Sequence, residues 1–286
     1  MRVVLLGFGD KPGVLEGADR LRPMIRQYAD IVGEDFTGIR PLKDLEADLA
    51  IVLGGDGSIL RAVRQMGYHQ VPVAAVNLGR LGFLADLIPE ELPHLLQQAA
   101  AGRLQIREHL MFECRLFRRG REVGCLLGLN ETAVLSGPPF ALLEIELYID
   151  GELVTTYSCD GLIISTPVGS TAHSLSAGGP ILRKELQAFV ICPISPHTLT
   201  NRPVVDGAER VYEMLVPQPQ RGTTLVVDGQ VVDSLQPGDK VRVERAPVSF
   251  RLVQPPGHSY YRTLREKLGW GGRWHPDRQK GNSSAQ

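Results

Sequence analysis

Hydrophobic positions follow two different patterns along the chain, and the pattern changes near residue 104. Before that point, short apolar runs predict buried strands at residues 3–6, 49–53 and 73–76. Apolar residues at helical spacing follow these runs, namely Leu15, Ala18, Leu21, Ile25 and Tyr28; Ile59, Leu60, Ala62, Val63 and Met66; and Leu92, Leu95, Leu96 and Ala99. Strands that alternate with helices predict an α/β N-terminal domain with a parallel sheet.

After residue 104 the pattern becomes that of antiparallel β-structure. Strands are predicted at residues 110–118, 122–129, 143–149, 152–157, 224–227, 240–244 and 248–253. Turn residues separate several of them, at Arg119-Gly120-Arg121, Asp150-Gly151 and Pro237-Gly238-Asp239, and Asp-Gly between apolar runs is a strong hairpin signal. The C-terminal domain is therefore predicted to be mainly antiparallel β.

This change of pattern gives the expected domain boundaries. We expect an α/β domain at residues 1–103 and a β-rich domain at 104–258. A helical run near residues 261–268 predicts a C-terminal segment, 259–278, whose helix returns to the first domain. A polar tail at 279–286 is expected to be disordered.

Composition narrows the classes of partner. The formal net charge is −1, and the chain has 43% hydrophobic and 22% charged residues, as in an ordinary globular protein. This charge gives no reason to expect a nucleic acid or a membrane surface as partner, and no apolar run reaches the ~20 residues of a membrane helix. The first apolar stretch is more typical of a strand than of a signal peptide, so we expect a cytoplasmic protein.

The chain contains four cysteines, Cys114, Cys125, Cys159 and Cys192. None belongs to a CxxC pair or lies at zinc-site spacing from a histidine. Because most lie in apolar, strand-like runs, we expect small core residues, with no disulfide and no structural metal.

The segment Gly54-Gly55-Asp56-Gly57-Ser58 carries the clearest chemical signal. It joins a predicted strand to a predicted helix, where glycine amides can approach an anion closely. A carboxylate does not help a bare phosphate site, but Asp56 can accept the proton of a hydroxyl that attacks a phosphate. The segment therefore suggests a kinase; the alternative is an ordinary turn in which Asp56 or Ser58 caps the helix.

Other segments, together with this loop, resemble the signature of the NAD kinase family. They occur in family order at residues 54–58, 77–84, 130–131, 160–180, 196–203, 228–230 and 264–270. A single Gly-Gly-Asp-Gly is a weak signal, whereas the ordered set is a strong one. The resemblance implies the two domains expected above, with NAD bound between them and across a subunit interface of a homodimer or homotetramer.

The implied reaction is transfer of the terminal phosphate of ATP, or of polyphosphate, to the 2′-hydroxyl of the adenosine ribose of NAD, which gives NADP. Mg²⁺ or another divalent metal would be held through the nucleotide phosphates, without a tight protein site. The choice between ATP and polyphosphate, and the acceptance of NADH, stay open at this point.

The resemblance also implies roles for individual residues. Asp56 matches the general base, and the loop that meets the phosphates comprises Gly54, Gly55, Gly57 and Ser58. Arg61, one helical turn later, can reach a phosphate or remain a solvated charge. The implied contacts to NAD are Asp56, Gly57, Arg61, Phe83, Asn130, Glu131, Asp160, Thr171, Ala172, His173, Ser174, Leu175, Ser176 and Gln230.

Some of these contacts have a simple chemical basis. The amide of Asn130 can pair with the edge of adenine, and the carboxylate of Glu131 can hold ribose hydroxyls. Asp160 matches a residue that reaches the nicotinamide end of NAD in the neighbouring subunit. Two positions depart from the usual pattern: Val168 replaces a threonine and removes a polar contact, and His173 replaces a tyrosine but can still stack and hydrogen-bond.

Three other classes of protein share single features with this sequence. A Rossmann oxidoreductase fits poorly, because the third glycine of the run Gly7 to Gly13 comes one residue late. A lipid or sugar kinase shares the glycine-rich loop but does not explain Asn130-Glu131. A non-enzymatic dinucleotide-binding regulator has no need of Asp56. The absence of a GxxxxGK[ST] sequence excludes a P-loop kinase.

Overall fold

Four parallel strands form one end of a ten-stranded sheet in the computed structural model, which describes residues 1–42, 45–79, 82–138, 142–198, 200–255, 257 and 259–269. In the order β2-β1-β3-β4 they are β2 (Asp30–Asp35), β1 (Arg2–Gly7), β3 (Leu49–Leu53) and β4 (Val73–Val76). The predicted bounds of β3 and β4 are confirmed. β2 was not predicted, because this edge strand is rich in charge and has no continuous apolar run.

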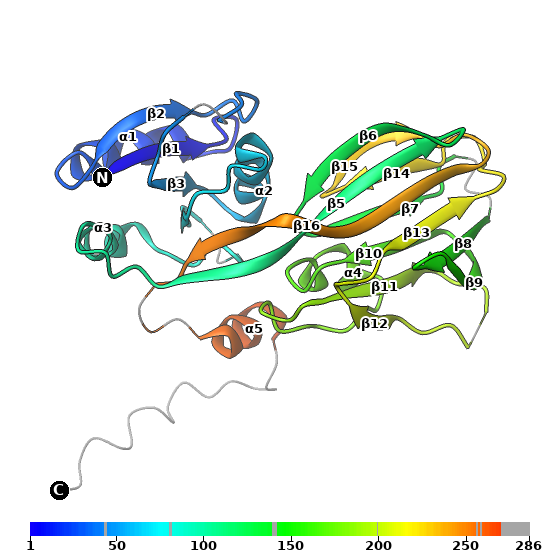
Figure 1. Cartoon of the computed structure of the whole chain (residues 1–286). Coiled ribbons are helices and arrows are strands. Elements are labelled where there is room, and N and C mark those ends of the chain that lie inside the picture. Colours follow the sequence, from blue (N-terminus) through cyan, green and yellow to red (C-terminus); the bar gives the residue numbers. More distant parts are fainter. Residues whose placement is uncertain are drawn as a thin grey trace, which may run out of the picture.

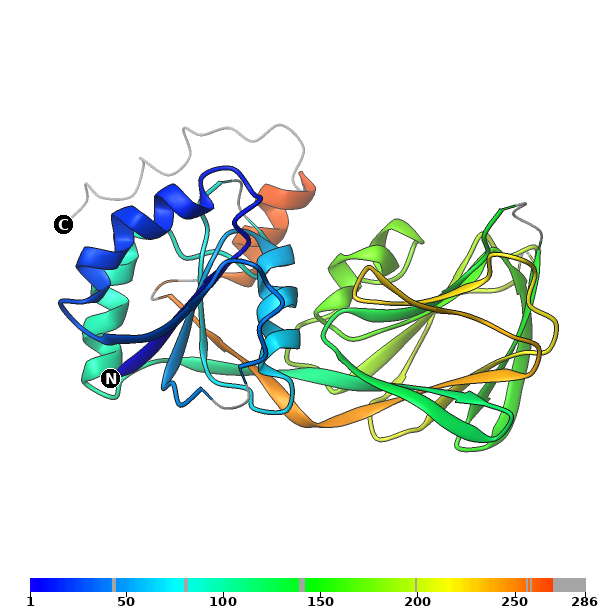
Figure 2. The ribbon, with the colours of Figure 1, turned by 90° about the horizontal axis from the view of Figure 1, so that it is seen from above.

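Helices cover both faces of this parallel part (Figure 2). One face packs against α1 (Val14–Ile25) and α3 (Leu92–Ala100), the latter preceded by the 3₁₀ turn η1 (Pro89–Glu91). The other face packs against α2 (Asp56–Met66). Strand alternation explains the two faces, since Leu5 joins the first cluster and Leu6 the second. Leu15 lies in α1 as predicted, but it is exposed and not on the buried face with Ala18, Leu21 and Ile25.

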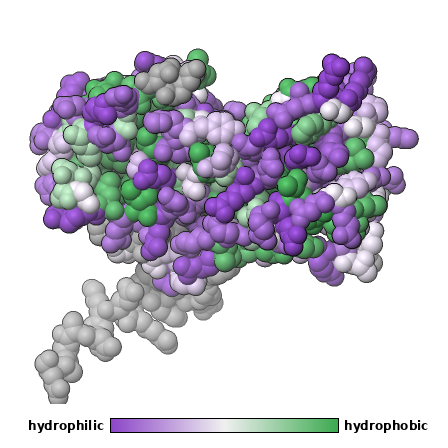
Figure 3. Space-filling view, viewed as in Figure 1, coloured by the Kyte–Doolittle hydropathy of each residue, from purple (hydrophilic) through white to green (hydrophobic). Residues whose placement is uncertain are grey.

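Two long strands carry the sheet from the α/β half into the β half (Figure 1). β16 (Asp239–Val253) pairs in parallel with β4 and antiparallel with β5 (Ile106–Arg118). The prediction of separate strands at 240–244 and 248–253 is wrong, because a bulge between Arg245 and Ser249 accommodates Pro247 without ending the strand. The outline of the molecule narrows where these strands join the halves (Figure 3).

The β half consists of two packed sheets. Continuing the first sheet are β6 (Arg121–Gly128), β13 (Tyr212–Val216), β8 (Leu143–Ile149) and β9 (Glu152–Cys159). The second sheet contains, in order, β12 (Val204–Gly207), β11 (Ala188–Ile194), β10 (Gly161–Ser165), β7 (Glu131–Leu135), β14 (Thr224–Val227) and β15 (Gln230–Ser234). Phe112 and Tyr212 from the first sheet and Leu162 from the second lie in one buried core. The predicted mainly antiparallel β domain is confirmed.

The predicted hairpin turns are confirmed by backbone geometry. Arg119 and Gly120 have φ angles of 52° and 75°, and Asp150 and Gly151 have φ angles of 51° and 82°. Two successive positive φ angles are typical of the type I′ turn, whose twist matches that of the flanking strands.

The helix α5 (Tyr260–Leu268) contacts both halves of the molecule. The Tyr260 hydroxyl donates to the carbonyl oxygen of Leu182 at 2.8 Å, and the Lys267 ammonium lies 5.5 Å from the centroid of the Phe83 ring. The domain boundaries given above stay predictions. The predicted tail at 279–286 lies outside the described residues, as do Arg80, Leu81, Leu199 and Trp270 of the recognised motifs.

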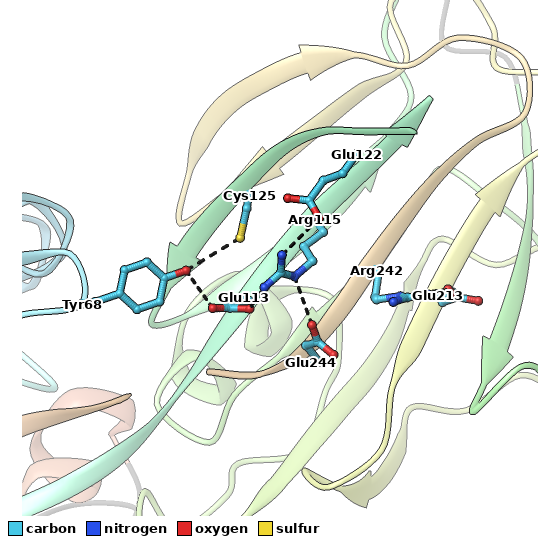
Figure 4. A network of polar contacts seen from close by, with 8 residues as sticks. All are labelled: Tyr68, Glu113, Arg115, Glu122, Cys125, Glu213, Arg242 and Glu244. Carbon is cyan, nitrogen blue, oxygen red and sulfur yellow. Dashed lines mark hydrogen bonds and ion pairs between the residues drawn. The ribbon is translucent and has the colours of Figure 1, made fainter. Parts of the chain in front are cut away.

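A polar network on β5, β6 and β16 forms a second link between the halves (Figure 4). Tyr68, just after α2, donates its hydroxyl to Glu113 on β5 at 2.7 Å. Arg115 pairs with Glu113 and, at 3.1 Å each, with Glu122 and Glu244. These contacts connect the end of α2 to the outer face of the β half.

The cysteine prediction is confirmed at three positions and wrong at one. Cys114, Cys159 and Cys192 are buried, whereas Cys125 is exposed on β6, beside the Tyr68 hydroxyl at 3.8 Å. Strand alternation turns Cys125 away from the core. Among the residues that the structure describes, no helix is long and apolar enough to span a membrane.

Candidate active site

The Gly54–Ser58 loop leaves the carboxyl end of β3 and begins α2. Gly54 has a φ of 125°, and an added Cβ would also collide with the Ser58 hydroxyl, so glycine is required there. A Cβ added to Gly55 or Gly57 would meet nothing within 4 Å. These two glycines therefore leave the backbone open to an incoming group.

A cleft of about 540 Å³ lies against this loop. It opens at the carboxyl ends of the parallel strands, where α/β sheets commonly bind ligands. Its lining residues are Phe8, Lys11, Pro12, Val14, Gly54, Gly55, Gly57, Ser58, Arg61, Asn77, Leu78 and Gly79. Arg61 stacks on the Phe8 ring, with 3.6 Å from its guanidinium carbon to the ring centroid. Two cationic side chains and the start of α2 make this cleft suited to an anion.

The Asp56 carboxylate is held by backbone amides from residues 83–85. One oxygen accepts the N–H of Phe83 at 2.8 Å, and the other accepts those of Leu84 at 2.9 Å and Ala85 at 3.1 Å. An added Cβ at Gly82 would collide with the same carboxylate. Asp56 and residues 82–85 therefore form one rigid unit beside the cleft.

Asp228 fixes the predicted Asn130-Glu131 pair in a similar way. Its carboxylate accepts backbone N–H bonds from Leu129 at 2.8 Å, Asn130 at 2.7 Å and Glu131 at 3.1 Å. Asp228 was recognised within a motif, but only Gln230 was carried into the predicted site. The exposed Gln230 begins β15, close to this cluster in the chain.

Glu131 is buried and incompletely bonded. In the described part of the chain its Oε2 atom has no hydrogen-bond partner. Burial raises the pKa of Glu131 to about 8, with the Asp228 carboxylate acting in the same direction and the His173 backbone N–H opposing it. A buried oxygen without a partner is well suited to bond a ligand.

The predicted segment 171–176 lies next to Asn130. Thr166, just before it, donates its hydroxyl to the Leu129 carbonyl oxygen at 2.6 Å and its N–H to that of Asn130 at 2.9 Å. The 3₁₀ turn η2 (Gly169–Thr171) and the short helix α4 (His173–Ser176) follow.

Side chains of this segment point in different directions. His173 and Ser176 are exposed, and Ala172 and Leu175 are half-buried. The Thr171 hydroxyl donates to the Val168 carbonyl oxygen at 3.1 Å. Ser174 is fully buried, and within the described residues its hydroxyl has no hydrogen-bond partner.

Val168 lies in the core, where it is 3% exposed and packs with Leu129 and Met111. The expected loss of a polar contact at this position stays a prediction.

Within one chain, Asp160 lies away from the other predicted NAD contacts. It precedes β10, whereas Thr166 follows the far end of that strand. At about 3.3 Å per strand residue the two ends lie roughly 15–20 Å apart. Asp160 is therefore placed to act away from its own chain's cluster.

Two charged residues near the site were not predicted from the sequence. Arg64 on α2 is half-buried and interacts electrostatically with Asp228. Lys184 is buried and donates to the Phe83 carbonyl oxygen. The only available signal was Arg64's position one turn after Arg61.

Comparison with known proteins identifies the family. The ATP-NAD kinase N-terminal domain matches residues 21–104, and the ATP-NAD kinase C-terminal domain matches residues 129–255. An NAD kinase from Rhodopirellula baltica is 54% identical over 272 residues, which cover 95% of this chain and 88% of that protein.

Two solved structures share the fold. A yeast NADH kinase complexed with NADH has a TM-score of 0.87 at 24% identity and covers 96% of this chain and 89% of its own. An NAD kinase from Archaeoglobus fulgidus in complex with ATP has a TM-score of 0.75 at 27% identity and covers 94% of this chain and 99% of its own. With both domains matched and close relatives covering most of its length, the chain belongs to the NAD kinase family.

Proposed function

We propose that this NAD kinase uses Asp56 as the general base that activates the 2′-hydroxyl of the adenosine ribose of NAD for attack on the terminal phosphate of ATP. The supporting observation is the position of Asp56, between cleft-lining Gly55 and Gly57, with its carboxylate held by three backbone amides. A carboxylate with two oxygens has about four acceptor sites. One therefore stays available for the ribose hydroxyl.

The cleft beside Asp56 is the proposed site of the phosphate donor. Lys11 and Arg61 supply positive charge, and the open backbone at Gly55 and Gly57 lets phosphates come close. Phosphoryl transfer depends mainly on such positioning and charge stabilisation. ATP is the proposed donor, and polyphosphate offers the same phosphate chemistry to the cleft.

A divalent metal fits this donor set only through the nucleotide. The described residues contain no group of three or more His, Cys, Asp or Glu side chains placed to hold a metal. Mg²⁺ is commonly bound by phosphates with few protein ligands. Because the one free acceptor site of Asp56 is assigned to the ribose hydroxyl, the phosphates would hold the metal. Bound there, Mg²⁺ would neutralise charge on the phosphates, while Asp56 orients the attacking hydroxyl.

The NAD acceptor is proposed to bind along Asn130, Glu131, Gln230 and residues 171–176. The buried Oε2 of Glu131 is suited to a ribose hydroxyl, and the exposed His173 and Ser176 are suited to the rest of the dinucleotide. Phe83, beside the Asp56 unit, completes the proposed contacts. Asp160 would contribute to the neighbouring subunit's site, which requires a homodimer or homotetramer. The near-zero net charge gives no reason to propose nucleic-acid or membrane partners. A cytoplasmic location remains part of the proposal.

A coupled assay of NADP formation tests the proposed substrates. NAD is supplied with ATP, then with polyphosphate, each with Mg²⁺ and after chelation. We expect metal-dependent NADP formation with ATP. Full activity after chelation would contradict the requirement for a divalent metal. Activity with polyphosphate but not with ATP would contradict ATP as the donor.

A further inference from the structure

Lys184 is a buried cation of the β half, and its side chain reaches the rigid unit formed by Asp56 and residues 82–85. It lies between α4 and β11, and its residue is 7% exposed. Its ammonium donates to the carbonyl oxygen of Phe83. Asp86, Asp56 and Glu185 act on it electrostatically. A buried ammonium is costly unless it is paired, so these contacts define its position.

Lys184 donates a hydrogen bond to the same peptide group whose N–H binds the Asp56 carboxylate. The Phe83 carbonyl and the Leu84 N–H belong to one peptide group. Leu84 donates that N–H to the Asp56 carboxylate at 2.9 Å. A hydrogen bond to the carbonyl polarises the peptide and strengthens its N–H as a donor. Lys184 therefore acts on Asp56 through a single rigid peptide.

The segment that carries Lys184 is itself fixed in the β half. The buried His109 contacts the Lys184 carbonyl oxygen through Nδ1 at 3.2 Å. Burial lowers the pKa of His109 to about 4, so its ring is neutral at neutral pH and can donate from Nδ1. The Tyr260 hydroxyl holds the Leu182 carbonyl oxygen at 2.8 Å. His109 is buried and Tyr260 is half-buried. Their two contacts therefore fix the backbone from which the Lys184 side chain extends.

The same segment is bonded to the proposed NAD-binding turn. The Leu182 N–H donates to the Ser170 hydroxyl at 3.0 Å, and Ser170 lies in η2, next to Thr171. A continuous path thus runs from the turn that would meet NAD, through Leu182 and Lys184, to the peptide that holds Asp56.

We propose that Lys184 is a positioning residue, which sets the Asp56 carboxylate from the β half and couples its placement to the NAD-binding turn. This inference rests on the proposed role of Asp56 as general base. Loss of the ammonium should displace residues 83–85, Phe83 among them, and leave the proposed NAD contacts of the β half in place.

The test compares Lys184→Met with the matched control Arg183→Met in the full-length chain. Arg183 is the adjacent cation, but it is exposed and its guanidinium faces Tyr260 and Tyr261. The readouts are kcat, the KM for NAD, and the dissociation constant for NAD by calorimetry. We expect kcat of Lys184→Met to fall about 10- to 100-fold, as for a displacement of roughly 1 Å. The loss of NAD affinity should be much smaller, because most of the proposed NAD contacts lie in the β half. Arg183→Met should retain the kcat of the unaltered chain.

Two further variants separate positioning from a general structural effect. Lys184→Arg keeps a cationic donor and should recover part of the lost kcat. The double variant Asp56→Asn/Lys184→Met should be no slower than Asp56→Asn alone, because Lys184 acts through Asp56. If Lys184→Met does not fold, Lys184→Gln keeps an N–H donor and takes its place in every comparison.

The outcomes distinguish this inference from the proposed function. An unchanged kcat in Lys184→Met, or an additional loss in the double variant, overturns the role of Lys184 and leaves Asp56 as base. An unchanged kcat in Asp56→Asn refutes the role of Asp56 as general base. The positioning role of Lys184, which acts through Asp56, then fails as well. Loss of NAD affinity in parallel with kcat overturns the positioning role as well.

Discussion

The carboxylate of Asp228 accepts the backbone N–H of Asn130 at 2.7 Å, across a separation of 98 residues. Two neighbouring amides bond to the same carboxylate, so Asp228 shapes the start of β7, where the proposed adenosine site lies. This makes Asp228 the support of Asn130 and Glu131 rather than a residue that must touch NAD.

Asp228→Ala should destabilise the chain and weaken NAD binding. Three backbone amides, two of them buried, would lose a charged acceptor, and such a hydrogen bond typically contributes about 1.5–3 kcal/mol. Thermal unfolding and the KM for NAD measure the two effects. The control is Asp233→Ala, which removes a more exposed ion pair with Arg118 and should have little effect. Equal behaviour of the two variants would argue against the support role.

Glu131 should make the stability of the ligand-free chain depend on pH. Its folded pKa, about 8, lies above the ordinary carboxyl value, so the folded state keeps a proton that the unfolded state releases. The stability that this proton provides is present at low pH and is lost as pH rises through about 8.

The variant Glu131→Gln stays neutral and should lose less stability over this pH range. Urea unfolding of both chains at about pH 5 and about pH 8 measures the difference. Parallel losses in the two chains would show that another group is responsible.

Arg61 should contribute more to binding of the phosphate donor than to binding of NAD. Arg61→Met should raise the KM for ATP about tenfold, as expected when a charge-assisted hydrogen bond is lost, while the KM for NAD changes less. Arg20→Met, which removes an exposed cation from α1, is the matched control. An unaltered KM for ATP would identify Arg61 as a solvated helix charge stacked on Phe8.

Asp160 should complete the site of a neighbouring chain. Asp56→Asn chains and Asp160→Ala chains should each be inactive, and mixing them should restore part of the activity once subunits exchange. Each restored site would combine an intact Asp56 with an intact Asp160 from the partner. Exchange demonstrated by labelled subunits without any recovery of activity would place Asp160 outside a shared site.

Much of the fold could be predicted because its signals are local. The apolar run at β3, the Asp150-Gly151 turn and the spacing in α3 each report on a few neighbouring residues. β16 was divided in two because Pro247 is a local signal for a break, whereas pairing with β5 continues past it. Long-range strand pairing overrode the local preference.

The site was predictable where a motif carries chemistry and not where contacts are distant. Gly54–Ser58 could be assigned because it occurs in family order with the other motifs, whereas the loop alone is a weak signal. The support from Asp228 and Lys184 arises only when remote segments meet. The inward turn of Ser174 was also unpredictable, because a four-residue helix is too short to show a periodic pattern.

The kinetics of Asp56→Asn test the central claim most directly. An amide cannot accept the ribose proton, and it also replaces one oxygen that receives backbone N–H bonds. We measure kcat and, separately, the dissociation constant for NAD, with thermal unfolding to confirm an intact fold. The predicted result is a folded chain that binds NAD normally, with kcat reduced about 10²- to 10⁴-fold, the usual contribution of a general base. A kcat close to that of the unaltered chain would contradict the assignment of Asp56 as the general base.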